Sequence, residues 1–429
     1  MTSKTFLLVV SLLLVITIGC GAASFPISRS VGVGPRISIV DSPSCPALAQ
    51  PGKWDSGIVE IQGGDVEGLL WYLRIAVPGT TLLLEDGVYQ LFPGQNLVIN
   101  TPGLTLRSAS GNREAVRIQG GDSNIIVNAD EFTVADVTLS EPRFHNIQVR
   151  GERGISGTRI YNVHMLDAGQ QFVKVSAGDG AKGKFADDGL VACSQIEYTT
   201  YAQSSYTNGV DILAGKGWVI RDNVFRRIRS QAGPAGPAIL VWKNSMDTVI
   251  RRNLIIDSWR GIALGLMMPD GTSRGGADVV YDHQNGLVEN NVILALREPG
   301  DAAIENNYAR NSEVLHNTVY YREGLNHTVN WSIEYRFSPT TVIITNNLTN
   351  LPLHKRAPLP EQDAEIQANV VGARANWFRD ILAEDYHLIH GSPAIDRGMV
   401  VVGNSIDFDG TRRPVGNAPD VGADEYNPD

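Results

Sequence analysis

A repeat of short apolar segments constrains the fold of this chain more than any other feature. Each copy has an apolar strand that ends at a polar residue and continues as a second apolar strand, as in residues 248–256 and 286–294. The copies are spaced by 26 residues from Asn291 to Asn317 and by 38 residues from Asn253 to Asn291. Such a period is typical of a solenoid, in which each coil stacks on the one before and insertions fall on loops.

The polar residue between the two strands of a copy is usually asparagine. The marked positions are Asp136, Asn162, Cys193, Asn223, Asn253, Asn291, Asn317 and Asn347. Neighbouring strands of a stacked sheet lie about 4.8 Å apart, so an inward amide can bond the amides above and below it. We therefore assign the asparagines to the architecture and not to an active site.

One helix is predicted, and it comes before the repeats. Apolar residues recur at helical spacing over residues 66–75, and a glycine turn and the strand-like segment 80–84 follow. The first coil of a solenoid exposes a core face that another element must cover. The pattern therefore predicts a helix that caps the N-terminal end.

The repeat region, from about residue 60 to 350, resembles the bacterial right-handed β-helix repeat proteins related to pectate, alginate and chondroitin lyases. The tail segments 385–388, 391–398, 407–414 and 420–426 are similar to the closing segment of many exported β-helix proteins. The resemblance implies an all-β, right-handed, single-stranded parallel β-helix with an N-terminal capping helix. We place the β-helix at residues 58–355 and the closing segment at 356–429.

The N-terminus predicts export. Lys4 precedes an apolar run, residues 6–18, which has the length of a signal-peptide core and is short for a membrane span. We assign residues 1–23 to a signal peptide and 24–57 to a flexible tether. Either an ordinary signal peptidase cleaves the chain, or the lipobox-like sequence before Cys20 leaves that cysteine lipidated. The mature protein is expected to be periplasmic or extracellular, without a transmembrane span, and anchored by lipid at the outer membrane if Cys20 is lipidated.

Charge and cysteine content limit the partners and the covalent framework. The net charge of -10 and the pI near 5.3 argue against general affinity for nucleic acid or anionic membranes. Beyond Cys20, only Cys45 and Cys193 remain. They either form one disulfide in an oxidising compartment or stay as two buried thiols. We expect a monomer.

Alternation along the strand-like segments predicts which side chains share an outer face of the solenoid. If the apolar members point inward, that face carries Arg150, Lys174, Asp211, Trp242 or Lys243, and Glu305. Residues 150–260 hold 15 Lys and Arg against 10 Asp and Glu, a balance of +5 in an acidic chain. A basic groove of this kind predicts an anionic extracellular polysaccharide as partner.

The resemblance implies β-elimination at a uronate, a reaction that needs a base and stabilisation of the developing charge. We predict Lys174 as the catalytic base and Arg260 as a catalytic cation that binds the substrate carboxylate together with Lys243. Asp211 would orient a lysine or hold a metal, with Ca²⁺ as a candidate cofactor. Further substrate contacts are assigned to Arg150, Trp242 and His283.

Several patterns leave other functions open. The acidic pair that precedes the lysine in alginate and chondroitin lyases is missing, and Asp282-His283-Gln284 only partly matches the Asp-Pro-His-Glu motif of mannuronan epimerases. His283 is therefore either a base or a structural loop residue. Asp187-Asp188 resembles a hydrolase pair, which would make the protein an inverting glycoside hydrolase. A non-catalytic glycan-binding or adhesive protein is the third reading, with Trp242, Trp259, Trp331 and Tyr335 stacking on sugars.

Overall fold

The structure is a computed structural model that describes residues 45–49, 57–356 and 363–428. The predicted signal peptide, including Cys20, and most of the predicted tether lie outside these residues. None of the helices in the described ranges is long and apolar enough to cross a membrane.

Almost all the described strands belong to three parallel sheets, here called sheets A, B and C. Sheet A contains β1 (Ile58–Ile61), β2 (Thr81–Leu84), β5 (Thr105–Ser108), β8 (Thr133–Ala135), β11 (Arg159–Tyr161), β14 (Leu190–Ala192), β17 (Val219–Arg221), β21 (Val249–Arg251), β25 (Leu287–Glu289), β29 (Ser312–Leu315), β32 (Thr341–Thr345) and β35 (Asp363–Gln367). Sheet B contains β3 (Gly87–Leu91), β6 (Val116–Gly120), β9 (Thr138–Ser140), β12 (His164–Leu166), β15 (Gln195–Glu197), β18 (Val224–Arg226), β22 (Leu254–Ile256), β26 (Val292–Ala295), β30 (Thr318–Tyr321), β33 (Leu348–Thr349) and β36 (Val370–Val371). Sheet C contains β4 (Leu97–Ile99), β7 (Ile125–Val127), β10 (Ile147–Arg150), β13 (Val173–Ser176), β16 (Val210–Leu213), β19 (Pro237–Trp242), β23 (Arg260–Leu264), β27 (Ile304–Asn307), β31 (Ile333–Arg336) and β34 (Leu353–Arg356).

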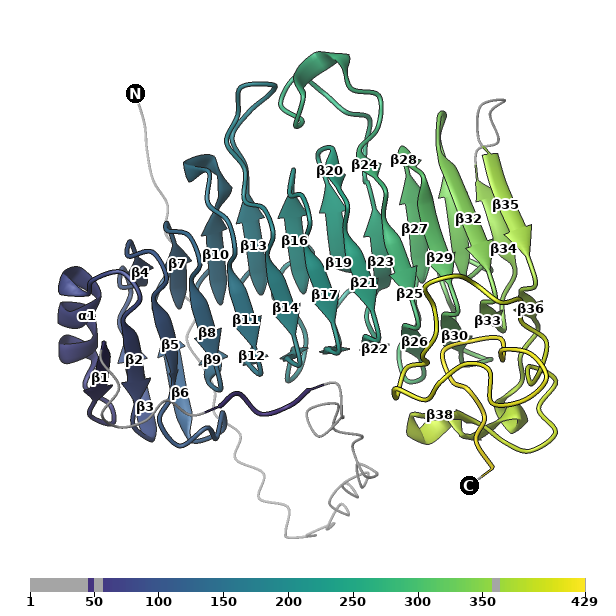
Figure 1. Ribbon diagram of the computed structural model, residues 1–429, viewed down its shortest axis with the longest axis horizontal. Helices are drawn as coiled ribbons and strands as arrows, with labels where there is room; N and C mark the ends of the chain where they lie inside the picture. The colour runs from purple at the N-terminus through teal and green to yellow at the C-terminus, as the bar shows by residue number, and fades with distance from the viewer. Residues whose placement is uncertain (1–44, 50–56, 357–362, 429) are drawn as a thin grey trace, which may run out of the picture. The chain divides into compact units, whose positions relative to one another are not determined.

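Successive strands visit sheets A, B and C in turn, so each circuit adds one strand to each sheet (Figure 1). A small fourth sheet, β20 (Ser245–Met246), β24 (His283–Gln284) and β28 (Ala309–Arg310), extends three of the coils. This is a right-handed parallel β-helix, as predicted. β35 and β36 continue two of its sheets past residue 355, the predicted end of the β-helix.

The predicted capping helix is confirmed as α1 (Val66–Ile75). Asp65 caps its N-terminus by accepting a hydrogen bond from the Gly68 amide at 2.8 Å. Leu69 and Leu73 are buried in the same core as the first strands. The helix therefore covers the apolar end of the first coils.

The asparagine ladder is present between sheets A and B. Asn291 Nδ2 donates to Asn317 Oδ1 at 3.0 Å, and the same amide-to-amide contact links each rung from Asn223 to Asn369. The prediction was wrong by one position for Asp136, Asn162 and Cys193, which have left-handed φ angles of 56°, 51° and 56°. In those coils the inward position after the left-handed residue is taken by valine or serine, so the ladder begins at Asn223.

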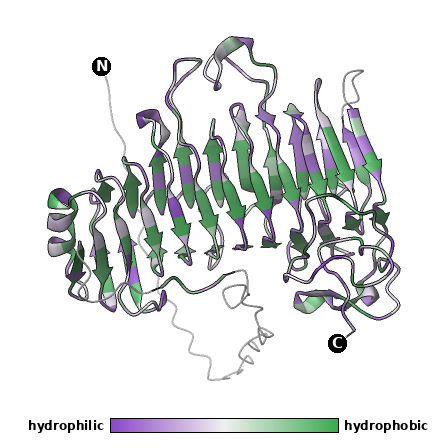
Figure 2. Ribbon diagram, viewed as in Figure 1, coloured by the Kyte–Doolittle hydropathy of each residue, from purple (hydrophilic) through white to green (hydrophobic). Residues whose placement is uncertain are grey.

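Apolar side chains fill the interior of the coils and give the hydrophobic colouring of the strands in Figure 2. Trp218 is fully buried, and its indole Nε1 donates to the Ala186 carbonyl at 2.8 Å. A Cβ at Gly189 would lie 2.4 Å from this ring. Glycine is therefore required where the tryptophan crosses the neighbouring coil.

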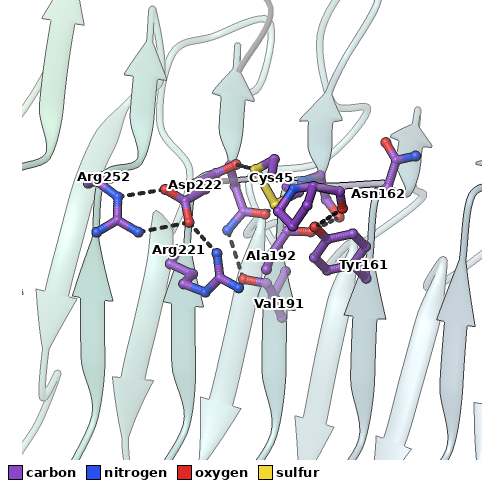
Figure 3. Close-up of a disulfide and its surroundings, with 12 residues drawn as sticks. Cys45, Tyr161, Asn162, Val191, Ala192, Arg221, Asp222 and Arg252 are labelled. Carbon is purple, nitrogen blue, oxygen red and sulfur yellow. Dashed lines mark hydrogen bonds and ion pairs between the residues drawn. A yellow bond between two sulfur atoms is a disulfide. The ribbon is translucent and has the colours of Figure 1, made fainter. Parts of the chain in front are cut away.

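Cys45 and Cys193 form a disulfide, so the reading as two buried thiols is wrong (Figure 3). The described part of the predicted tether, residues 45–49, lies against the solenoid. Tyr161 Oη donates to the Pro46 carbonyl at 2.6 Å, and Arg107 donates to the Ala49 carbonyl at 2.8 Å. This part of the predicted flexible tether is therefore held in place.

We expect loss of the disulfide to lower the free energy of unfolding by about 3–5 kcal/mol, because it closes a long loop in the unfolded chain. The two cysteines are separated by 148 residues. Urea unfolding of the Cys45→Ser, Cys193→Ser double variant would measure the loss. Reductant should lower the stability of the native chain and leave the double variant unchanged; equal stability of the two proteins would contradict the prediction.

The C-terminal segment packs on the outer face of sheet B over the last coils. It contains the antiparallel pair β37 (Phe378–Asp380) and β38 (Asp385–Leu388). Phe378 packs edge-to-face on Tyr320 of β30, with ring centroids 6.1 Å apart. Arg413 is buried, pairs with Glu425 at 2.9 Å and donates to Asn290 Oδ1 at 3.3 Å. The segment thus covers a side of the solenoid.

Candidate functional site

The outward face of sheet C carries a row of polar side chains, because strand register aligns one residue from each coil. The row reads Gln148, Lys174, Asp211, Leu240, Ala263, Glu305, Glu334 and His354. Leu240 and Ala263 interrupt it. The polar residues therefore form two separate clusters on one face.

The first, called the lysine cluster, consists of Lys174, Asp211, Trp242 and Lys243. Lys174 Nζ lies 2.5 Å from Asp211 Oδ2, and Trp242 Nε1 donates to Asp211 Oδ1 at 2.8 Å. The Asp211 side chain is only 4% exposed and that of Lys174 is 13% exposed. Both carboxylate oxygens of Asp211 are thus used to hold the lysine and the indole in place.

Lys243 extends this cluster toward a long loop. Its Nζ lies 5.4 Å from the centre of the Trp242 ring, 3.0 Å from Asp270 Oδ2 and 2.6 Å from Thr272 Oγ1. The Lys243 hydrogen bond is one cause of the pKa of Asp270 falling to about 2, after the larger effect of the Thr272 hydroxyl. Lys243 is therefore paired with a carboxylate of the protein, Asp270, at the place where a substrate carboxylate was predicted.

Two loops rise beside the lysine cluster, residues 177–189 and 265–282, and they contact each other (Figure 1). Arg274 donates to both oxygens of Asp187 at 2.8 Å, and its guanidinium lies 4.3 Å from the centre of the Phe185 ring. A pocket of about 440 Å³ lies here, lined by Arg153, Ser156, Lys184, Phe185, Asp187, Asp188 and Arg274, among others. This pocket adjoins the loop that holds Lys243.

The second, called the arginine cluster, consists of Arg260, Asp301, Glu305, Glu334, Arg336 and Arg356. Arg260 Nε lies 3.1 Å from Asp301 and 3.5 Å from Glu305. Arg336 bridges the two glutamates, at 3.5 Å from Glu305 and 3.4 Å from Glu334. Both glutamates are buried beneath these arginines, and burial raises the pKa of Glu305.

The structure does not bring Lys174 and Arg260 together. Lys174 lies on β13 and Arg260 begins β23. In sheet C these two strands are three strand spacings apart, with β16 and β19 between them. Three strand spacings amount to about 14 Å. The predicted pairing of these two residues in one site is therefore wrong, whereas Lys174, Asp211, Trp242 and Lys243 do lie together.

Arg150 lies near the lysine cluster, on β10. Its Cα is paired with Ser176, two residues beyond Lys174 on the neighbouring strand, and its side chain is half-buried. It stands on the outward face, as alternation predicted. Its position is compatible with a contact to a ligand that covers the lysine cluster.

The prediction of His283 as a substrate contact is wrong. His283 lies in β24, is fully buried, and its Nε2 is 3.0 Å from Thr248 Oγ1. Burial lowers the pKa of His283 to about 3. The residue is a neutral part of the packed interior and has no contact with solvent.

His283 makes stability depend on pH. Its folded pKa lies below the unfolded value of about 6.5, so between these values only the unfolded chain takes up the proton, and stability falls as pH decreases. We expect His283→Gln to flatten the dependence of unfolding free energy on pH by roughly 1 kcal/mol per unit between about pH 6 and 4. Urea unfolding at several pH values measures this. Parallel pH profiles for the two proteins would contradict it.

The excess of basic residues in 150–260 does not form one basic groove. Arg221 and Arg252 pair with Asp222 beside the disulfide (Figure 3). Arg226 pairs with Glu384 of the C-terminal segment at 2.8 Å. These arginines lie on or next to strands of sheets A and B, and their ion pairs neutralise them away from sheet C.

Several residues of the arginine cluster and of the loop beside the lysine cluster were not predicted. They lie in loops or coils outside residues 150–260: Asp270, Thr272, Arg274, Asp301, Glu334, Arg336 and Arg356. Asp187, suggested as half of a hydrolase pair, is held by Arg274. The row of outward positions, extended to β31, would have identified Glu334.

The fold and site define a parallel β-helix with polar clusters on one outer sheet. No family model and no curated protein matches the sequence. Among solved structures, the fold is similar to the pectate lyase Pel9A, with a TM-score of 0.60 and 15% identity over 86% of this chain and 96% of that chain. The A-module of the Azotobacter vinelandii mannuronan C-5 epimerase AlgE6 is less similar, with a TM-score of 0.45 and 12% identity over 74% and 97% of the two chains. At these identities the likeness is one of fold.

Proposed function

We propose that the protein acts on a uronate-containing polysaccharide by β-elimination at the lysine cluster. The observation that carries the proposal is the contact of Lys174 with Asp211, which Trp242 fixes from the other side. The three residues come from neighbouring strands of a rigid sheet. A preorganised amine on an outward sheet is a suitable base for a polymer lying along that sheet.

In this reaction Lys174 Nζ takes the proton next to the uronate carboxylate. The bond from the ring to the leaving sugar oxygen then breaks, a carbon–carbon double bond forms in the ring, and the leaving oxygen takes up a proton from water. Asp211 and Trp242 position the amine, whereas Arg150 is available to bind the carboxylate and stabilise its developing charge.

The described residues at the lysine cluster do not fit a calcium ion. Both oxygens of Asp211 are engaged by Lys174 and Trp242, and Asp270 is engaged by Lys243 and Thr272. Groups of three potential metal ligands occur elsewhere in the described chain and not here. We therefore assign no step to a metal.

The likeness to the pectate lyase supports the fold on which this chemistry would rest. A panel of pectate, alginate and chondroitin, with and without calcium, tests the proposal by ultraviolet absorbance of the unsaturated product. New absorbance with one glycan establishes a lyase and its substrate. Binding of a glycan without product on the whole panel would overturn the proposal in favour of a glycan-binding protein.

A further inference from the structure

The C-terminal segment contains a third polar cluster, unrelated to sheet C. It combines β38 with two loops, residues 407–411 and 420–426, both from the tail segments noted in the sequence. A pocket of about 200 Å³ lies between them, lined by His387, Asp409, Thr411 and Asp424, among others. The proposed glycan chemistry leaves this cluster without a role.

Three side chains converge in this pocket. Nitrogen or oxygen atoms of His387, Asp409 and Asp424 all lie within 4.8 Å of one another. His387 Nε2 is 3.1 Å from Asp409 Oδ2. An imidazole and two carboxylates at this separation form a ligand set that a single ion can bridge with small rotations of the side chains.

The surroundings hold these ligands in position. Asp385 Oδ1 lies 2.5 Å from His387 Nδ1, so the other ring nitrogen faces the two carboxylates. The Leu388 amide donates to Asp424 Oδ2 at 2.7 Å. A carboxylate on the second nitrogen of a histidine is the usual partner of a metal-bound imidazole, since it fixes the tautomer and the ring orientation.

Asp407 builds the loop that presents Asp409. Its Oδ1 accepts from the amides of Asp409 and Thr411 at 2.9 and 2.7 Å, and its Oδ2 accepts from the Glu425 amide at 3.0 Å. The first two bonds shape the loop 407–411, and the third joins it to the loop 420–426. The position of Asp409 relative to Asp424 is thus set by backbone contacts and does not depend on His387 alone.

A buried hydroxyl provides an independent observation. Tyr386 is 1% exposed, and its Oη has no hydrogen-bond partner. The Tyr386 ring stacks on the His387 imidazole, with ring centroids 4.8 Å apart. A buried polar atom without a partner is costly, so the hydrogen bonding in the layer next to His387 is incomplete.

We propose that His387, Asp409 and Asp424 bind one divalent transition-metal ion, such as Zn²⁺ or Mn²⁺, in the C-terminal segment. The imidazole favours these ions over Ca²⁺ and Mg²⁺, which prefer oxygen ligands alone. The ion joins β38 to the loops 407–411 and 420–426. Its role is to hold the segment closed against sheet B, since the cluster is part of the packing of that segment.

Isothermal titration of the full chain, freed of metal with a chelator, tests this proposal. We expect one Zn²⁺ or Mn²⁺ per chain, an increase in Tm with either ion, and at least tenfold weaker binding in Asp409→Asn and in Asp424→Asn. Glu365→Gln, which removes one exposed carboxylate from β35, should bind as the native chain does.

Three results would overturn the proposal. They are the absence of Zn²⁺ and Mn²⁺ binding, equal affinity in the native chain and both variants, and binding of Ca²⁺ alone. His387 would then be a protonated partner of the carboxylates. If circular dichroism shows that Asp424→Asn is unfolded, Asp409→Asn decides the matter, because the Asp409 side chain is 42% exposed and its replacement leaves the core intact.

Discussion

Lys174→Ala is expected to abolish the formation of unsaturated product on the glycan that the native protein cleaves. General-base catalysis contributes about 10²- to 10⁴-fold to rate, so kcat should fall by at least about a hundredfold. The effect on KM should be smaller, since Lys174 is only 13% exposed and most of the sheet surface remains. Initial rates of ultraviolet absorbance give both constants.

Lys216→Ala is the matched control for this experiment. Lys216 is an exposed lysine whose only described ion pair is a 4.0 Å contact with Asp247. Its replacement removes one positive charge from the same central coils and should leave kcat unchanged. Full activity of Lys174→Ala would place the base elsewhere, and an equal loss in both variants would indicate a general charge effect.

Asn291→Ala should lower the free energy of unfolding by about 2–4 kcal/mol, because it breaks the ladder in the middle of the solenoid. The Asn291 Nδ2 atom donates to the Ile250 carbonyl at 2.9 Å and to Asn317 Oδ1 at 3.0 Å. Its Oδ1 accepts from the backbone and side chain of Asn253 at 3.0 and 2.9 Å. All of these groups are buried, so each loses a partner that water cannot replace.

Urea unfolding followed by circular dichroism measures this loss. Asn100→Ala is the control, because Asn100 is exposed and accepts a single surface hydrogen bond from Asn128. Its free energy of unfolding should change by less than about 0.5 kcal/mol. An Asn291 variant as stable as the control would show that the ladder adds nothing to stability.

The fold could be predicted from the sequence because its repeat is local. The strands and the turn of each coil lie within a few tens of residues. The repeat can therefore be recognised in the sequence without knowledge of long-range contacts. The assignment of Asp136, Asn162 and Cys193 to the ladder was wrong by one position for a local reason as well. The left-handed residue and the inward ladder residue are adjacent, and asparagine suits both positions.

The candidate site could be predicted only in part. Alternation and stacking identified Lys174 and Asp211 as neighbours, since strand register pairs them, and placed Trp242 on the same face of the next strand, opposite Leu213. The other residues of the site could not be predicted, because the loops between the strands vary in length. Arg260 was predicted to share a site with Lys174, yet its ion-pair partners are Asp301 and Glu305 from later coils.

The C-terminal segment also has a consequence for the order of assembly. It covers apolar residues on the outer face of sheet B, among them Leu254, Leu294 and Tyr320. During synthesis each coil can pack on the coil before it, whereas the C-terminal segment is synthesised last. Until this segment docks, a partly folded molecule exposes these apolar residues to other chains. Self-association during folding is therefore concentrated on this part of sheet B.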